Sequence, residues 1–125
     1  MGSLVAAKLA EAGHDVTMID VVREAFTRLP AEFHGRQVLG TAIDVDVLRD
    51  AGLGEADVFL ALTRGDNTNA VSAQLAERMF STPTVLARIT DPERAEVFKK
   101  LGLKTFCPTI RNGEYLLELL NEQGR

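Results

Sequence analysis

Gly2 and Asp20 flank a helix and a strand at the start of the chain, at a spacing that could serve binding chemistry. In dinucleotide-binding folds a strand leads into the sequence G-x-G-x-x-G, a helix follows, and an acidic residue comes about 20 positions later. Gly2 takes the place of the third glycine, where helix and strand must approach closely, and Asp20 ends the next strand, where the acid belongs. The pattern predicts a phosphate at the helix N-terminus and ribose hydroxyls at the Asp20 carboxylate. The alternative is that Asp20 serves only as a helix cap or a turn residue.

Few other side chains could support catalysis or metal binding. Cys107 is the one cysteine and there are two histidines, so the sequence offers neither an internal disulfide nor a metal-ligand cluster. Tyr115 is followed by Leu119, where a Tyr-x-x-x-Lys proton relay would need lysine, and no cysteine–histidine pair lies near a strand end. The sequence therefore predicts a binding protein that is not an enzyme, and Cys107 is expected to pack as a small apolar group.

Length and composition narrow the class of protein. The chain has 125 residues, which is enough for one domain, with 46% hydrophobic and 26% charged residues and a net charge of −4. An acidic chain without a dense Lys/Arg patch argues against nucleic-acid binding. The apolar runs are too short for membrane insertion, and no signal peptide precedes them, so a cytoplasmic location is expected.

The hydrophobic pattern alternates between helical and strand-like periods along the whole chain. Helices are expected at 3–12, 22–33, 44–51, 66–80, 91–101 and 113–122, and strands at 14–20, 37–41, 57–63, 84–89 and 104–107. Strict alternation with short connections is typical of a parallel sheet flanked by helices. The predicted fold class is therefore α/β, with a Rossmann-like, doubly wound parallel sheet.

The predicted sheet lacks its first strand and most of the glycine-rich loop, because the chain begins with a helix. In the doubly wound order that strand lies centrally, between the strands expected at 14–20 and 57–63. Its absence would leave two inner edges with unpaired backbone groups, which is costly when they are buried. We expect that the sequence is truncated at its start; the alternative is that another segment fills the gap.

Three ordered blocks of sequence resemble a known family. They read G-[DT]-A-x-D-x-x-x-L-x-x-A-G at 40–52, A-[LV]-T-x-x-D-x-x-N at 61–69 and A-R-x-x-D-P-x-x-A-x-x-x-x-x-L-G at 87–102. Over nearly its whole length the chain resembles the N-terminal lobe of TrkA/RCK (regulator of potassium conductance) proteins. The resemblance implies a ligand-binding regulatory domain of a potassium uptake system or channel, which binds NAD(H), ATP or ADP at the strand carboxyl ends and assembles as a homodimer or a larger ring.

The resemblance also implies roles for individual residues. The helix N-terminus at Gly2 and Ser3 would face phosphate, and Asp20 would accept from ribose hydroxyls and repel a 2′-phosphate, which favours NAD(H) or an adenine nucleotide over NADP. Thr41 and Ala42 would lie near the adenine, with Thr41 standing where many relatives have aspartate. The loop from Thr63 to Asp66 would close over the ligand, Asn69 would fix that loop to its helix, and Arg88 could reach a phosphate or a neighbouring subunit. The implied cofactor-binding residues are Gly2, Ser3, Asp20, Arg23, Thr41, Ala42, Thr63, Arg64, Asp66, Asn69 and Arg88.

Several of these residues have a simpler structural interpretation. Asp66 is a good helix cap, and capping is expected as its main role. Arg88 leaves a buried strand and needs a partner, so a salt bridge to Asp44, Asp66 or Asp91 is as plausible as a ligand contact. Asp91 is expected to start a helix, with proline in its first turn.

The expected organisation is a nucleotide-binding domain at 1–110 and a terminal amphipathic helix at 111–125, which would act as a crossover or dimer helix. The alternative is that this helix closes a flank of the sheet. The resemblance implies a nucleotide sensor that controls transport by ligand-dependent conformational change, at the inner membrane through a transporter or channel subunit. Two alternatives remain: an NAD-dependent oxidoreductase of the same fold, or an oligomerisation remnant that binds nothing.

Overall fold

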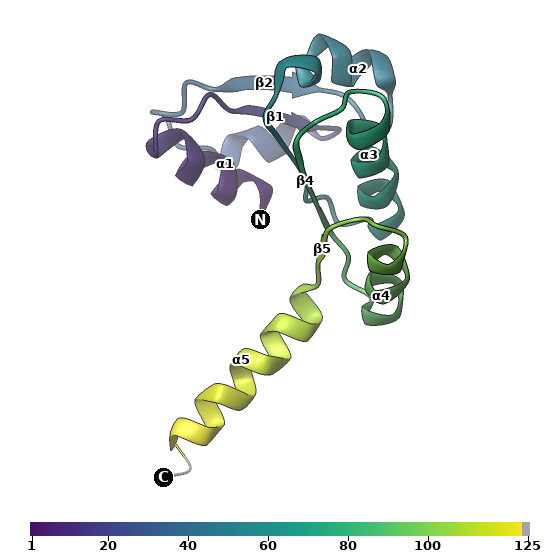
Figure 1. Cartoon of the computed structure of the whole chain (residues 1–125). Coiled ribbons are helices and arrows are strands. Elements are labelled where there is room, and N and C mark those ends of the chain that lie inside the picture. Colours follow the sequence, from purple (N-terminus) through teal and green to yellow (C-terminus); the bar gives the residue numbers. More distant parts are fainter. Residues whose placement is uncertain (124–125) are drawn as a thin grey trace.

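The computed structural model describes residues 1–123, in which helices and strands alternate along the chain (Figure 1). Two of the elements, η1 and η2, are short 3₁₀ helices. The order is α1 (Gly2–Glu11), β1 (Thr17–Asp20), η1 (Arg23–Arg28), β2 (Arg36–Leu39), α2 (Val45–Asp50), η2 (Leu53–Glu55), β3 (Val58–Ala61), α3 (Asp66–Arg78), β4 (Thr84–Arg88), α4 (Pro92–Lys100), β5 (Thr105–Phe106) and α5 (Pro108–Gln123).

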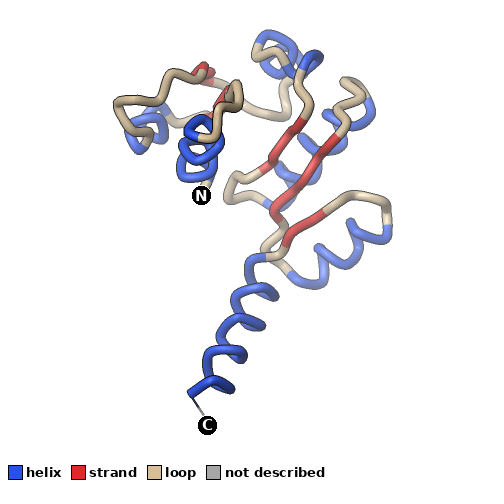
Figure 2. The backbone as a smooth tube through the Cα atoms, turned by 60° about the vertical axis from the view of Figure 1, so that its left-hand side comes forward, coloured by secondary structure: helices blue, strands red, loops and turns tan. Residues whose placement is uncertain are grey.

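The five strands form two parallel sheets, one of two strands and one of three (Figure 2). β1 pairs with β2, and β4 lies between β3 and β5. Within the described residues β1 and β3 each pair along one edge only. The predicted α/β class and the parallel strands are confirmed. The sheets separate between β1 and β3, the strands expected at 14–20 and 57–63, between which the sequence predicts a missing strand.

Side-chain packing joins the two sheets. The main core lies around α3, β3 and β4 and consists of Leu48, Leu53, Ala61, Ala70, Ala73, Ala76, Val85, Ala87, Ile89, Ala95 and Leu103. The alanines of α3 recur at helical spacing on one face, and their small size lets the helix lie close to the sheet. Ile19 of β1 and Ala42, which follows β2, pack against this core. The smaller sheet is therefore attached by apolar contacts, without backbone pairing between β1 and β3.

Helix ends follow the local signals of the sequence. Gly13, Gly52 and Gly102 have φ angles of 93°, 91° and 96°, a left-handed conformation that glycine adopts without strain at the end of a helix. Asp44 and Asp91 precede α2 and α4, and each side chain accepts a hydrogen bond from the backbone N–H two residues later. The predicted helix start at Asp91 is confirmed, and Asp44 caps the helix that the sequence predicts from residue 44.

Two predicted helices have different limits in the structure. The prediction of a helix at 22–33 is wrong, because only the 3₁₀ helix η1 forms there. Leu29 precedes Pro30, which disfavours helical backbone at the preceding residue, and Leu29 is extended with φ −73° and ψ 142°. The terminal helix begins at Pro108 rather than at 113, so that Gly113 lies inside α5.

α5 extends away from the rest of the molecule (Figure 1). Leucine side chains along it are more than 40% exposed, namely Leu116, Leu117, Leu119 and Leu120. None of the helices in the described part of the chain is long and apolar enough to cross a membrane. The leucine side chains of α5 are therefore not covered by the described residues.

Candidate functional site

The sequence-predicted site residues gather at the carboxyl ends of the strands. Asp20 ends β1, Thr41 follows β2 by two residues, Thr63 follows β3 by two residues and Arg88 ends β4. Ligands of open α/β sheets bind outside this edge, because the loops that leave it are free to surround them. In the described residues these side chains fall into two groups, one on each sheet.

Asn69 holds the first group together. This side chain on α3 is fully buried, and its Oδ1 accepts from the Thr63 amide at 2.9 Å and from the Thr63 hydroxyl at 2.6 Å. Its Nδ2 donates to the carbonyl oxygens of Thr63 at 2.9 Å and of Arg88 at 2.8 Å. The predicted link between the loop and its helix is thus present, and it extends to β4. Both the oxygen and the nitrogen of the Asn69 amide are bonded within the protein, so this side chain holds the loop after β3 in place.

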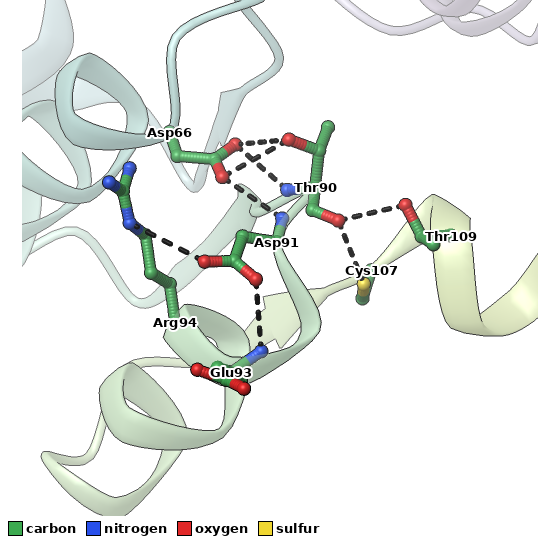
Figure 3. A network of polar contacts seen from close by, with 7 residues as sticks. All are labelled: Asp66, Thr90, Asp91, Glu93, Arg94, Cys107 and Thr109. Atoms are coloured by element: carbon green, nitrogen blue, oxygen red, sulfur yellow. Dashed lines mark hydrogen bonds and ion pairs between the residues drawn. The ribbon is translucent and has the colours of Figure 1, made fainter.

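Asp66 clamps the loop that follows β4 (Figure 3). Its carboxylate accepts from the Thr90 amide at 2.8 Å, from the Thr90 hydroxyl at 2.9 Å and from the Asp91 amide at 3.0 Å. The N-cap of α3 is Gly65, and no side chain caps it. The expected capping role of Asp66 is therefore wrong: its partners lie 24 and 25 residues further along the chain.

Thr90 connects this clamp to the start of α5. Its carbonyl oxygen accepts from the Thr109 hydroxyl at 2.8 Å, and the Cys107 sulfur lies 3.6 Å from the same oxygen (Figure 3). Cys107 is half-buried and packs against the core as expected. The contribution of Thr90 and Thr109 was missed, because no local pattern marks two threonines that meet through the fold.

The environment of Asp66 acts on its protonation in opposing directions. Burial raises the pKa of this carboxyl, which is 8% exposed, but hydrogen bonds from Thr90 and Asp91 lower it. The positive charge of Arg94 adds to the lowering, and the net effect is a pKa below the ordinary value. Asp66 is therefore ionised in the folded chain at neutral pH, which charge-assisted hydrogen bonds require.

This depressed pKa predicts an acid-sensitive part of the stability. The pKa of Asp66 is lower in the folded than in the unfolded chain, so its contribution is complete above the unfolded pKa of about 3.9 and is lost as the pH falls through the folded value. Urea unfolding at a series of pH values should therefore show a shallower loss of stability below about pH 4 in Asp66→Asn than in the unmodified chain. Equal slopes in the two proteins would contradict this assignment.

The second group surrounds the end of the smaller sheet. One Asp20 oxygen accepts from the Val22 amide at 2.9 Å, and the other has no hydrogen-bond partner within residues 1–123. The Gly40 amide donates to the Asp20 carbonyl at 2.9 Å, which fixes the end of β1 beside the loop after β2. A Cβ at Gly40 would come within 2.9 Å of the Val47 side chain, so glycine permits α2 to pack there. Ala42 turns toward the core rather than outward.

Several other predicted site residues have polar groups that form few or no contacts within the described residues. Gly2 and Ser3 open α1, where the first backbone N–H groups have no acceptor within the helix. Arg23 and Arg64 are exposed and form no ion pair with any residue that the structure describes. The proposed salt bridge of Arg88 is likewise not formed there. Its Nη1 lies 3.4 Å from the Thr63 carbonyl, and its buried Nε has no partner among the described residues.

The free groups at this edge fit a nucleotide by their chemistry. The α1 amides and the Arg88 guanidinium are donors that suit phosphate oxygens, and the unpartnered Arg88 Nε is a buried donor without an acceptor. The open oxygen of Asp20 is an acceptor that suits ribose hydroxyls. Asp66 and Asn69, by contrast, have their polar atoms occupied by the protein. The arrangement can bind an anion with attached hydroxyl groups.

Comparisons with known proteins show which family the chain resembles. The model of the TrkA-N domain family matches residues 1–108. The chain is 41% identical over 124 residues to the Trk system potassium uptake protein TrkA of Streptomyces coelicolor, covering 99% of this chain and 56% of that protein. It is 35% identical over 115 residues to a TrkA homolog of Pyrococcus horikoshii, covering 91% of this chain and 50% of that protein. The chain thus spans about half the length of the curated relatives that it matches.

Solved structures share the fold. The TrkA-N domain of the inner membrane protein ybaL from Escherichia coli superposes with a TM-score of 0.84 at 21% identity, covering 96% of this chain and 89% of that chain. GsuK bound to ADP gives a TM-score of 0.74 at 20% identity, covering 93% of this chain and 31% of that chain. Together with the family model over residues 1–108, these likenesses identify the sequence: the chain belongs to the TrkA-N domain family.

Proposed function

We propose that the chain is the nucleotide-sensing regulatory domain of a potassium uptake system or channel and controls transport by a ligand-dependent conformational change. The observation that carries this proposal is the strand edge itself. Asp20 lies on one sheet and the group of Thr63, Asn69 and Arg88 on the other. A ligand that contacts both groups would favour one relative placement of the two sheets, and a partner could respond to that placement.

NAD(H) is the proposed ligand, with ATP or ADP as alternatives. The Asp20 carboxylate supports a free ribose hydroxyl over a 2′-phosphate, because two negative charges would lie side by side. Phosphates would interact with the α1 amides at Gly2 and Ser3 and with Arg88. GsuK, which shares the fold, has been solved with ADP. The exposed Arg23 and Arg64 would lie at the rim of the site.

The proposed domain is not an enzyme and acts through partners. Those partners are a second copy or a larger ring of this chain and a membrane potassium transporter or channel subunit, which would place it on the cytoplasmic side of the membrane. Asp66 and Asn69 would position the loops around the ligand rather than touch it. Tyr115, the one tyrosine, is exposed on α5, away from the strand edge, so the described residues give an oxidoreductase little support.

The decisive measurement is nucleotide binding by calorimetry. The chain should bind NADH more tightly than NADPH, and Asp20→Ala should weaken NADH binding by about tenfold, since one charge-assisted hydrogen bond is lost. Asp15→Ala, an exposed acidic residue before β1 and away from the carboxyl edge, should leave the affinity unchanged. A dissociation constant of about 1 mM corresponds to a binding free energy of about 4 kcal/mol. If the dissociation constants of NADH, ATP and ADP are all larger than this, the sensor proposal is refuted.

One observation favours a second candidate function, an oligomerisation module that binds no nucleotide. The leucine side chains of α5 are exposed in the described part of the chain, as they would be on a surface that associates with another copy. In that case α5 alone would carry the function. The calorimetric experiment separates the two candidates, because the module would self-associate and bind none of the three nucleotides.

A further inference from the structure

A groove lies at the amino ends of β1 and β2, at the opposite end of the smaller sheet from the Asp20 carboxylate. Val16 directly precedes β1 and Gly35 directly precedes β2, so both residues lie at the edge where these parallel strands begin. The groove has a volume of about 510 Å³, and the second half of α1 forms one of its walls. It is therefore separate from the proposed nucleotide site.

Backbone contacts fix the shape of this groove. The Arg36 amide donates to the Val16 carbonyl oxygen at 3.0 Å, which ties the loop before β2 to the start of β1. Within that loop the Phe33 amide donates to the Pro30 carbonyl oxygen at 3.0 Å. A Cβ at Gly35 would collide with the Phe33 ring and with the Val16 carbonyl oxygen, so glycine is needed for the ring to lie there. The groove is thus shaped by the packing of the loop, which suits it to receive a partner with little rearrangement.

The lining of the groove combines apolar side chains with exposed carboxylates. The apolar side chains are those of Ala7, Ala10, Val16, Pro30 and Phe33. Glu11, Asp15 and Glu32 contribute three carboxylates, and all three residues are exposed. Among the described residues neither lysine nor arginine lines the groove, so its formal charge is −3 with His14 and His34 counted as neutral. This surface is called the acidic groove below.

A partner of the acidic groove must bring positive charge together with apolar side chains. Lys8 lies 4.0 Å from Glu11, but both side chains are exposed, and such a pair contributes little and can exchange for another. Nucleic acid has the wrong sign of charge, because its phosphates would face carboxylates. A second copy of this chain offers no extended basic segment, since Lys99 and Lys100 are the one place in the sequence where two basic residues are adjacent. The chemistry therefore fits a peptide segment rich in Lys and Arg from a different protein.

Cytoplasmic loops of membrane proteins have this composition. They carry an excess of Lys and Arg close to the ends of the transmembrane helices, where apolar residues are near. We propose that the acidic groove binds a basic cytoplasmic loop of a membrane potassium transporter or channel subunit. This inference rests on the proposed function and names the surface that receives its membrane partner. Opposite charges guide the encounter, and the apolar lining accepts the apolar side chains of the loop.

The position of the acidic groove explains how a bound loop could respond to a nucleotide. The lining residues all lie between positions 7 and 35, in the part of the chain from α1 to β2, which Figure 1 shows apart from α4 and β5. Asp20 lies at the other end of β1, about 13 Å away for a strand of four residues. The loop holds the smaller sheet, and a nucleotide at Asp20 and Arg88 sets the placement of that sheet relative to the larger one. The membrane partner is thus attached to the part that the ligand positions.

Fluorescence anisotropy with labelled peptides tests this surface. One set of probes covers the cytoplasmic loops of the potassium transporter subunits of the same organism, and a designed peptide has lysines on either side of a leucine and a phenylalanine. The designed peptide and at least one loop peptide should bind with dissociation constants below about 1 mM, and added salt should weaken the binding. A version of the designed peptide with glutamate in place of lysine should not bind.

Substitutions in the acidic groove should weaken the binding of both kinds of peptide. E11Q/D15N/E32Q should raise the dissociation constants about tenfold, because three exposed ion pairs are lost. Ala10→Phe leaves the charge unchanged and fills the groove from the side of α1, so it should also raise them. The two variants therefore test the charge and the shape of the groove separately.

A matched variant controls for the change in net charge. Asp50, Glu55 and Glu96 are exposed and lie outside the lining of the acidic groove. D50N/E55Q/E96Q therefore removes the same number of negative charges and should leave peptide binding unchanged. Equal binding by this control and by the groove variant would show that only the overall charge attracts the peptides, and the proposal would be overturned.

Two further results would overturn the proposal. The first is that the designed peptide fails to bind, or that it binds and no loop peptide does. The second is that E11Q/D15N/E32Q dissociates an oligomer of the chain in sedimentation equilibrium while the control variant does not, because a second copy would then occupy the groove. Peptide binding without nucleotide binding refutes only the sensor function, whereas NADH binding without peptide binding refutes only this docking surface.

Discussion

Replacing Asp66 with alanine should destabilise the fold by about 3 kcal/mol or more, although Asp66 belongs neither to the apolar core nor to a salt bridge. The carboxylate is the acceptor for two backbone amides and one hydroxyl, at Thr90 and Asp91. Alanine leaves these donors without a partner in a partly buried position, and the cost of each unsatisfied donor adds to the lost hydrogen bonds. Urea unfolding followed by circular dichroism measures the loss.

A matched control separates this clamp from ordinary helix capping. Asp44 is exposed and accepts one hydrogen bond, from the Asp46 amide at 2.9 Å, at the start of α2. Asp44→Ala should cost about 1 kcal/mol, which is typical of a lost N-cap. If Asp66→Ala lowers the free energy of unfolding by no more than Asp44→Ala does, the hydrogen bonds from Asp66 to Thr90 and Asp91 contribute no more to stability than an ordinary helix cap.

Asn69→Asp should be the second severe substitution, with an expected loss of about 3 kcal/mol or more, although it alters a single atom and preserves the shape. Nδ2 donates to the carbonyl oxygens of Thr63 and Arg88, and an aspartate would place an oxygen against both. Two hydrogen bonds become repulsive contacts, and a charge is placed at a fully buried position. The same unfolding experiment applies.

Asn67 provides the control for this substitution. It lies on the same turn of α3 but is exposed, so Asn67→Asp introduces the same chemical change in water. Its effect should stay within about 0.5 kcal/mol, because surface substitutions away from specific contacts are nearly neutral. Similar losses in the two variants would mean that the network around Asn69 does not hold the ends of β3 and β4 together.

The features that the sequence predicted correctly are those with local causes. The helices expected to end at 12, 51 and 101 are each followed by a glycine with positive φ, at Gly13, Gly52 and Gly102. The helix start at Asp91 depends on a hydrogen bond to a residue two positions away. The parallel arrangement follows from the alternation of elements and the short loops. Even the place without a strand could be inferred, because the order of strands in a doubly wound sheet is regular.

The errors arose where a distant partner or a single residue decided the outcome. Asp66 has the sequence context of a cap, but its carboxylate gains three donors from the loop after β4, which only the folded sheet brings near. Helical periodicity at 22–33 was overruled by Pro30, which restricts the residue before it. Thr109 gave no signal, since its partner, the carbonyl oxygen of Thr90, is nineteen residues away.

The separation of β1 from β3 has a consequence for cooperativity. Segments joined by side-chain packing alone can open independently, because no ladder of backbone hydrogen bonds has to break between them. The part of the chain from α1 to β2 would then unfold at a lower free energy than the part around α3. A molecule held by Asp20 on one side and by Arg88 on the other would bridge the two parts. Binding of that molecule would therefore raise the free energy needed to open the part from α1 to β2, so that ligand affinity and local stability are linked.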